Sequence, residues 1–441
     1  MTPYKPGCDF SVLVPVLAHT ENLAQILQVL RTGLERFPAQ FEILVGAQEG
    51  MEEVRRIAEK EGATFVGVKS SGYGNLILDC VHVAKGNYIL TIDPDAAYPM
   101  DAVRKLWMAH EDADVLIGSR YVALSHVEQP WIRNALSWAM NTFFATVLST
   151  PIRDLSSGFR LYRRDVFRRL EFRSKSLAFL LETLLKFAGN GISVKEIPFH
   201  YKLQSYRKAQ AHGFRLGIEC LASLRALWRM RNSVECADYD LRAFNSRIPL
   251  QRYWQRKRYR LLVRFAETDA RILDVGCGSG RFIADLSSGF GVDIRPEKLR
   301  YMRSFNPLLV AADGLSLPFP DQSFECVVSS EVIEHIPNEN GRFIDELTRV
   351  LKPGGVLVLG TPDYDSRTWR FFEYLYGKAA PDAYAHEHVT HYTFSTLVSA
   401  LESRGYGILN HGCVMGSIIV IQARKTGDGD RGQASKPPKE A

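Results

Sequence analysis

Short apolar runs and amphipathic segments alternate twice along this sequence, and that alternation limits the fold more than any other feature. Between Phe10 and Val122 the apolar runs are FSVLVPV, FEILVGA, ATFVGV, YILTID and DVLIGS. A second series contains ARILDVG, SGFGVDI, LLVAAD, FECVVSSEVI and GGVLVLGTP. Strands that alternate with helices are typical of parallel sheets covered by helices on both faces. The sequence therefore predicts two three-layer α/β domains in series.

The domain boundaries follow from changes in this pattern. Residues 8–231 contain the first alternation and a mostly helical stretch with one further extended segment, GISVKEIPFHY. Residues 232–425 contain the second, and we expect 232–267 to form helices that lead into it. Residues 426–441 are polar and rich in Gly and Pro, which predicts a disordered tail.

Composition bears on the compartment and on the partners. The net charge of +6 is small for 441 residues, so we expect no nucleic-acid partner. The seven cysteines contain no CxxC pair, which is typical of a reducing compartment without structural zinc. No run reaches the roughly 18 apolar residues of a membrane-spanning helix. We therefore expect a cytoplasmic protein.

Two apolar segments with basic flanks, LSWAMNTFFATVLST and LGIECLASLRALWRMR, have the character of interfacial helices. They suggest peripheral contact with the inner face of the plasma membrane and a lipid-linked phosphate as substrate. The alternative is that both segments are buried helices that pack on the sheet.

In the second domain, the segment ILDVGCGSGRF predicts a strand, a glycine-rich turn and a helix. Gly276, Gly278 and Gly280 allow the backbone to approach a ligand at the helix N-terminus. Asp293 ends the next strand, about 20 residues further on, where a carboxylate accepts hydrogen bonds from ribose hydroxyls. A nicotinamide dinucleotide would use the same contact, but its fingerprint requires a small residue where Arg281 stands. A nicotinamide-dependent oxidoreductase is therefore disfavoured.

The segment from Tyr239 to Ala423 resembles class I S-adenosylmethionine-dependent methyltransferases, whose fold is Rossmann-like. The matching pieces are the glycine turn opened by Asp274, the acidic residue Asp293, AADGLSLPF, FECVVSSEVIEHI and LKPGGVLVLGTP. The resemblance implies S-adenosylmethionine as cofactor. It also implies that Asp274 and the three glycines hold the methionine moiety, Asp293 the ribose and Asp313 the adenine amino group.

Transfer to an acceptor hydroxyl would need a base, and two clusters offer one. The first, in SEVIEHI, contains Glu331, Glu334 and His335, and EVIEH resembles a metal-associated motif of quinone-biosynthesis O-methyltransferases. The second, AHEHVTHYTF, contains His386, Glu387, His388 and His391. We expect His335, His388 and His391 to be catalytic candidates because the pKa of histidine lies near neutrality, and we favour the second cluster for substrate contact. The alternative for the first cluster is that it only positions the cofactor or caps a turn.

In the first domain, TIDPDAAYP places Asp93 and Asp95 at the end of an apolar strand. Two carboxylates in this position suit Mg²⁺ or Mn²⁺ that bridges a diphosphate, because hard cations take oxygen ligands. A strand-end turn without a metal is the alternative.

The sequence from Asp9 to about Arg229 resembles inverting family 2 glycosyltransferases of the GT-A fold, of the dolichol-phosphate mannose synthase type. The matching pieces are SVLVPV, GNYILTIDPDAAYP, DVLIGSRYV, RDLSSGFRLYRRDVF and GISVKEIPFHY. The resemblance implies a nucleotide-diphosphate sugar donor and a glycan or lipid-linked phosphate acceptor. The residues that it implicates are Pro15, Asp93, Asp95, Arg120 and Arg160 for the nucleotide sugar, with Asp93 and Asp95 on the metal, and Asp154 as base.

The sequence departs from this family where the nucleotide base is held. Ala18 and His19 replace the usual Asn-Glu pair, and the segment from Gly46 to Glu49 replaces an Asp-Asp-Gly-Ser turn.

Two hypotheses follow for the function of the whole chain: a bifunctional enzyme of glycan or glycolipid biosynthesis, or a methyltransferase whose first domain is an inactive docking module. The oligomeric state stays open.

Overall fold

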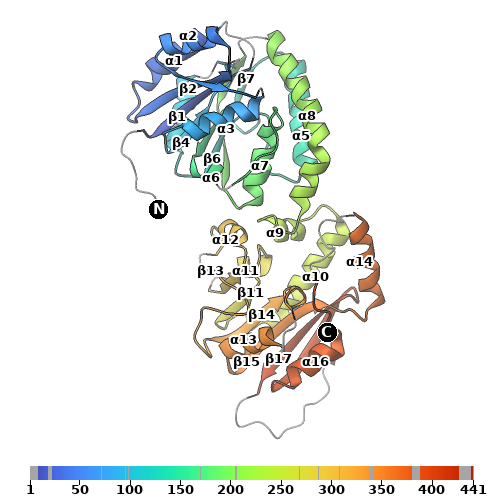
Figure 1. Ribbon diagram of the computed structural model, residues 1–441. Helices are drawn as coiled ribbons and strands as arrows, with labels where there is room; N and C mark the ends of the chain where they lie inside the picture. Colours follow the sequence, from blue (N-terminus) through green and yellow to red (C-terminus); the bar gives the residue numbers. More distant parts are fainter. Residues whose placement is uncertain are drawn as a thin grey trace. The chain divides into compact units, whose positions relative to one another are not determined.

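The chain forms two compact units, residues 1–232 and 233–441, in the computed structural model (Figure 1). The structure describes residues 8–17, 22–70, 72–94, 96–97, 99–168, 170–203, 206–267, 269–286, 288–306, 308–337, 341–379, 388–426 and 439–440. No helix in these ranges combines the length and the apolar character needed to cross a bilayer.

The N-terminal unit contains a seven-stranded sheet and a three-stranded sheet. Its strands are β1 (Phe10–Val16), β2 (Phe41–Gln48), β3 (Thr64–Val68), β4 (Tyr88–Thr91), β5 (Ala96–Ala97), β6 (Val115–Ser119), β7 (His126–Glu128), β8 (Arg160–Arg163), β9 (Val194–Pro198) and β10 (His200–Leu203). Its helices are α1 (Leu23–Leu34), α2 (Glu52–Lys60), α3 (Tyr73–Val83), α4 (Met100–Met108), α5 (Trp131–Val147), α6 (Asp165–Arg168), α7 (Phe179–Gly189) and α8 (Tyr206–Asn232).

A seven-stranded sheet with the order β3-β2-β1-β4-β8-β6-β9 forms the centre of this unit. β1 is buried along its whole length, as expected for a central parallel strand that is covered on both faces. Helices α1 and α4 pack on one face, and α3 and α7 on the other (Figure 1). A separate sheet with the order β5-β10-β7 begins just after Asp93.

The C-terminal unit begins with the two expected lead-in helices, α9 (Tyr239–Phe244) and α10 (Pro249–Phe265). Its strands are β11 (Ile272–Val275), β12 (Phe290–Asp293), β13 (Leu309–Ala311), β14 (Phe324–Ser330), β15 (Leu351–Pro362), β16 (Tyr406–Val414), β17 (Ile418–Lys425) and β18 (Lys439–Glu440). The remaining helices are α11 (Arg281–Asp285), α12 (Pro296–Met302), the short 3₁₀ helix η1 (Ile333–His335), α13 (Arg342–Val350), α14 (Arg367–Ala379) and α16 (Phe394–Glu402).

One sheet with the order β13-β12-β11-β14-β15-β17-β16-β18 runs through the C-terminal unit. Helices α13 and α16 bury apolar side chains on one face, while α10 and α11 cover the other. Strands β11 to β14 pair in parallel, so the loops that follow β11, β12 and β14 meet at one edge. That edge carries the glycine turn and Asp293.

The prediction of two α/β domains is confirmed, but both sheets are mixed rather than parallel. β8 was not predicted and runs antiparallel between β4 and β6. Its four residues, RLYR, begin and end with arginine, so they carry little of the apolar signal of a central strand. β16 and β17 were also missed, because an antiparallel pair falls outside the strand–helix alternation. Most of the tail expected to be disordered lies outside the described residues, and its described part, Lys439–Glu440, pairs with β16.

Candidate functional sites

The backbone conformation of the turn after β11 requires glycine, whether or not a ligand approaches the turn. Gly276 and Gly278 have φ values of 72° and 54°, in the left-handed region that favours glycine. A Cβ at Gly276 would lie 2.2 Å from Val332, and one at Gly278 would lie 2.5 Å from Asp240 Oδ2. Gly280 instead caps α11 with an extended backbone, and a Cβ there would lie 3.2 Å from the Cys277 carbonyl oxygen. The turn therefore packs against Val332 and Asp240 whether or not a ligand is bound.

Asp274 and Asp293 lie buried on neighbouring strands beside this turn, 7% and 8% exposed. Asp293 accepts hydrogen bonds from the Gly278 and Arg295 amides, each at 2.8 Å. Burial, with a smaller effect from Asp293, raises the pKa of Asp274 to about 7. Within the described residues, no hydrogen bond reaches the Asp274 carboxylate. A buried carboxylate in this state suits a cationic ligand group.

Sequence analysis gave no role to Asp240 on α9, yet it organises the turn. Its Oδ2 accepts from the Ser279 amide at 3.0 Å and from Lys298 Nζ at 2.9 Å. Burial acts to raise the pKa of Asp240, but the Lys298 ammonium and the Ser279 amide outweigh burial and lower it to about 2. Asp240 and Lys298 thus fix α9 and α12 against the turn. Because 58 positions separate them, no local motif could have signalled the pair.

Asp313 follows β13 at the same edge of the sheet and is exposed. Its Oδ1 accepts from the Leu315 amide at 2.9 Å, which orients the carboxylate in the loop. The structure thus places the three acidic residues expected to bind the cofactor, Asp274, Asp293 and Asp313, after or within successive strands of one sheet edge.

Arg258 of α10 is a second residue that sequence analysis missed. It forms an ion pair with Glu331, which follows β14 and has a φ of 58°. Burial lowers the pKa of Arg258, while the charges of Asp240 and Glu334 oppose that shift. The Arg258 side chain, 15% exposed, therefore lies among several carboxylates of this domain.

His388 lies beside Glu334 and His335, although the sequence analysis placed it in a different cluster. Their donor atoms all lie within 4.8 Å of one another, a spacing compatible with a shared metal ion. Glu334 is buried and accepts from Thr361 Oγ1 at 3.1 Å, and burial raises its pKa to about 7. The Glu334 carbonyl also accepts from the Val389 and Thr390 amides, which joins the segment after His388 to η1.

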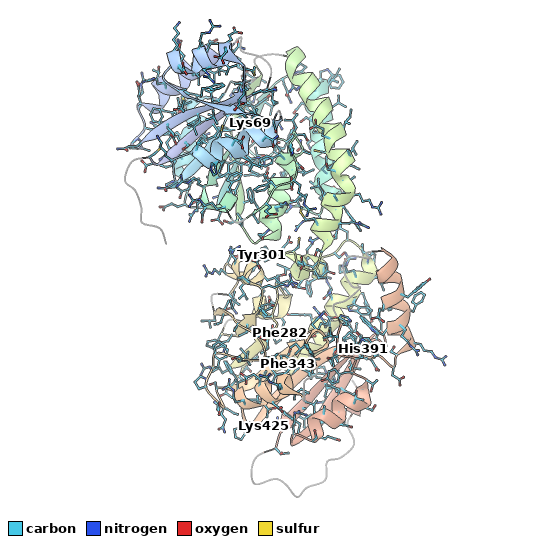
Figure 2. The ribbon with its side chains drawn as sticks, viewed as in Figure 1. Lys69, Phe282, Tyr301, Phe343, His391 and Lys425 are labelled. Carbon is cyan, nitrogen blue, oxygen red and sulfur yellow. The ribbon has the colours of Figure 1, made fainter. Side chains whose placement is uncertain are left out.

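The proposed pKa of His388 near neutrality is wrong. Burial, followed by the charges of His335 and His391, lowers the pKa of His388 to about 4, so it is neutral at physiological pH and a weak base. Its Nδ1 lies 2.6 Å from Tyr364 Oη. His391, labelled in Figure 2, stacks on the Tyr364 ring at 4.1 Å. His386 and Glu387 lie outside the described residues.

In the N-terminal unit, Asp93 follows β4 and packs against the segment that contains Asp154. Tyr73 Oη donates to Asp93 Oδ1 at 3.3 Å. A Cβ at Gly158 would lie 2.2 Å from Asp93 Oδ2, so only glycine allows this approach. Asp95 lies outside the described residues, and Pro15 is buried at the end of β1 beside Gly46 of β2.

Asp154 does not have the geometry of a general base. It is fully buried and held by Arg120, with Nε–Oδ2 at 2.8 Å and Nη2–Oδ1 at 2.6 Å. The Arg120 amide also donates to Oδ2, at 2.9 Å. Burial acts to lower the pKa of Arg120, but Asp154 outweighs burial and raises it, so the guanidinium stays charged. Asp154 therefore serves as the fixed partner of Arg120, which corrects the expected role.

Arg160 is likewise structural, and the expectation that it pairs with phosphate is wrong. It is fully buried. Its guanidinium donates to the carbonyls of Ser157, Leu155 and Leu180, at 2.7, 2.8 and 2.9 Å. The contacts with Leu155 and Ser157 hold the D-x-x-S-G-F-R loop together, and the contact with Leu180 joins the loop to α7.

Arg120 is instead part of a group of cations and tyrosines near Asp93. Its guanidinium lies over the rings of Tyr121 and Tyr201, at 5.2 and 5.4 Å. Burial raises the pKa of Tyr201, the charges of Arg120 and Arg133 oppose the shift, and Asp93 adds to it. Arg133, near the start of α5, is thus a further basic residue at this site that sequence analysis did not select.

Comparison with known proteins agrees with the division of the chain into two α/β domains. Residues 11–171 match the glycosyl transferase family 2 and residues 273–359 match the methyltransferase domain family. The chain joins a family 2 glycosyltransferase domain to a methyltransferase domain.

The relatives match one domain at a time. The glycosyltransferase domain is 26% identical over 195 residues to the low-salt glycan biosynthesis hexosyltransferase Agl6 of Haloferax volcanii, covering 43% of this chain and 47% of the relative. It is 33% identical over 118 residues to a polyprenol monophosphomannose synthase of Mycolicibacterium smegmatis, covering 26% and 44%. The methyltransferase domain is 34% identical over 121 residues to a probable S-adenosylmethionine-dependent methyltransferase of that organism, covering 26% and 47%. This chain spans less than half the length of each relative.

In the glycosyltransferase domain, β2 ends at Ala47 and Gln48, and the first acidic residue after it is Glu49. Ala47 is buried and Gln48 exposed, and the Glu49 amide donates to the Val68 carbonyl at 3.0 Å. A carboxylate contact to a nucleotide base is thus open to Glu49 but not to Ala47.

Proposed function

We propose that the chain is a bifunctional enzyme of glycan or glycolipid biosynthesis, which transfers a sugar from a nucleotide sugar and a methyl group from S-adenosylmethionine. The observation that carries the proposal is the acidic strand edge of each domain: Asp93 beside Gly158 in one, and Asp274 with Asp293 beside the glycine turn in the other. Fusion keeps a shared acceptor at high effective concentration for the second reaction.

In the methyltransferase domain, the residues fit S-adenosylmethionine. The Asp274 carboxylate suits the methionine ammonium, and the nearby Arg258, whose charge interacts with Asp274, suits the methionine carboxylate. Asp293 would accept from the ribose and Asp313 from the adenine amino group. Bound S-adenosylmethionine supplies an activated methyl group, and most of the catalysis would come from alignment of the acceptor.

The acceptor of the methyl group is proposed to lie beside Tyr364, His388 and His391. The neutral His388 can accept a hydrogen bond from the acceptor, but it is too weak a base to remove a hydroxyl proton efficiently. Glu334, whose pKa is about 7, is a better matched acceptor for that proton. In the alternative arrangement, Glu334 is not the proton acceptor, and a divalent metal held by Glu334, His335 and His388 would act on the same acceptor as a Lewis acid.

In the glycosyltransferase domain, Asp93 and Asp95 are proposed to hold Mg²⁺ or Mn²⁺ on the donor diphosphate. The metal would supply charge neutralisation for the leaving group. Arg133 and Arg120, fixed by Asp154, offer positive charge to a phosphate-bearing acceptor at the same edge. The resemblance to a polyprenol monophosphomannose synthase supports a lipid-linked phosphate as this acceptor.

Helices α5 and α8 pack side by side and carry an apolar surface (Figure 1). Its exposed members are Trp131, Ile132, Leu136, Trp138, Phe143, Ile218, Leu221 and Trp228, from 40% to 78% exposed. Arg225 and Arg229 are exposed on the same helices. Exposed tryptophans combined with arginines suit an anionic membrane surface, and we propose that this face binds one.

Vesicle flotation tests the membrane proposal. The wild-type chain is expected to float with vesicles rich in phosphatidylglycerol, and the triple substitution of Trp131, Leu136 and Trp138 by Ala is expected to lose at least about two thirds of that binding. A matched control replaces exposed apolar residues elsewhere in the same unit, Val29, Val83 and Met108, by Ala. Equal flotation of both triple variants, or no flotation of the wild type, would contradict the proposal.

Thermal stability with ligands tests the two activities separately. S-adenosylhomocysteine is expected to raise the melting temperature of one transition, and one of a panel of uridine and guanosine diphosphate sugars with Mn²⁺ is expected to raise the other. Asp93→Asn should remove only the second response. A response to S-adenosylhomocysteine with none to any nucleotide sugar would instead support the hypothesis that the first domain is an inactive docking module. The altered turn at Ala47 is the sequence feature that favours this hypothesis.

A further inference from the structure

The small sheet β5-β10-β7 carries two histidines and a glutamate that neither proposed activity uses. β7 and β10 pair in parallel, with His200 opposite His126 and Lys202 opposite Glu128. Side chains alternate along a strand, so these four residues share one face of the sheet. The donor atoms of His126, Glu128 and His200 all lie within 4.8 Å of one another, and the three residues are exposed.

The contacts within this group already bring the three donors together. His200 Nε2 lies 2.6 Å from Glu128 Oε1, and the rings of His126 and His200 are 4.7 Å apart. The second oxygen of Glu128, Oε2, is 3.2 Å from Lys202 Nζ. Register, rather than flexible loops, sets the spacing, because all three donors stand on paired strands.

We propose that His126, Glu128 and His200 form a binding site for Zn²⁺ or a similar divalent transition metal. Imidazole nitrogens and a carboxylate bind Zn²⁺ at about 2.0–2.2 Å, and tetrahedral ligands then lie about 3.3–3.5 Å apart. To reach this spacing, the 2.6 Å His200–Glu128 contact must open and His126, whose donor atom lies within 4.8 Å of the other two, must move closer. Water would take the fourth position. Because Lys202 shares Glu128, it competes with the metal.

A metal at this position would act on the sugar-transfer site from the opposite face of the sheet. Tyr201 lies between His200 and Lys202, so it points the other way, where it is buried beneath the Arg120 guanidinium. The metal would join β7, which leads into α5, to β10, which carries Tyr201. It would thereby fix Tyr201 and the start of α5 relative to each other.

Zinc titration of the full chain against a chromophoric chelator tests the site. The background is the His335→Ala, His388→Ala double variant, which removes the other histidine-containing cluster. On this background, adding His126→Ala and His200→Ala is expected to remove one zinc equivalent, whereas His82→Ala, an exposed histidine on α3, removes none. An unchanged stoichiometry in the four-residue variant would overturn the proposal.

A second variant tests the competition by Lys202. Lys202→Gln frees Glu128 and is expected to tighten zinc binding about two- to fivefold, the range that a surface ion pair contributes. If His126, Glu128 and His200 had only a structural role, loss of the Lys202–Glu128 ion pair would not improve the affinity for zinc. Unchanged or weaker binding in this variant would count against the site even if the histidine variants misfolded.

Discussion

Asp274→Asn is expected to weaken the binding of S-adenosylhomocysteine by about 100-fold, because a hydrogen bond to a charged group contributes about 1.5–3 kcal/mol. The substitution keeps the shape of the side chain and removes the charge that would face the ligand ammonium. Isothermal titration calorimetry on the full chain measures the change. Asp269→Asn, an exposed site in the same unit, is the control and should bind like the wild type.

The same residue predicts the pH dependence of binding. Asp274 has a pKa of about 7 in the free protein, and a bound ammonium favours its ionised form. Binding must therefore release a proton below pH 7, so the wild-type affinity should rise between pH 6 and pH 8 and level off above. Burial also raises the pKa of Glu334 to about 7, and this group remains in the variant, so the difference between the wild-type and Asp274→Asn profiles, rather than either profile alone, reports on Asp274. A variant with wild-type affinity and wild-type pH dependence would exclude Asp274 from the site.

Asp154→Asn is expected to lower the unfolding free energy of the glycosyltransferase domain by about 3–5 kcal/mol, because it leaves a buried cation without its partner. Arg120 is only 10% exposed and Asp154 is fully buried, so the guanidinium would keep little solvation to replace the lost carboxylate. Urea unfolding followed by circular dichroism measures the loss. Saturating S-adenosylhomocysteine stabilises the other domain and separates the two transitions.

Two controls distinguish a structural Asp154 from a catalytic one. Asp112→Asn breaks an exposed ion pair with Lys195, at 2.6 Å, and should cost less than about 1 kcal/mol. Combining Asp154→Leu with Arg120→Met removes both buried charges and should recover most of the stability lost by Asp154→Asn. If Asp154→Asn left stability unchanged while abolishing sugar transfer, Asp154 would be a base and our assignment would fail.

The sequence alone determined the features that depend on neighbouring residues. The strands and helices of both alternations were readable because central parallel strands need continuous apolar runs such as FSVLVPV. The glycine turn was readable because Gly276 and Gly278 meet a backbone requirement within a few residues. Asp93 was selected because two carboxylates one residue apart at a strand end suit a divalent cation, and Asp293 because its spacing after the glycine turn suits a ribose contact.

Tertiary structure decided the features that join distant parts of the chain. Thirty-four positions separate Arg120 from Asp154. Because the two residues pair, Asp154, which the sequence analysis expected to be a base, is instead a buried residue that holds Arg120 in place. The approach of His388 to Glu334 and that of His200 to His126 are equally long-range. Such contacts depend on strand order and on the loops that β8 and η1 place, which local pattern does not encode. A residue type with its local spacing indicates a chemistry, but burial and the partner it meets decide whether that side chain can perform it.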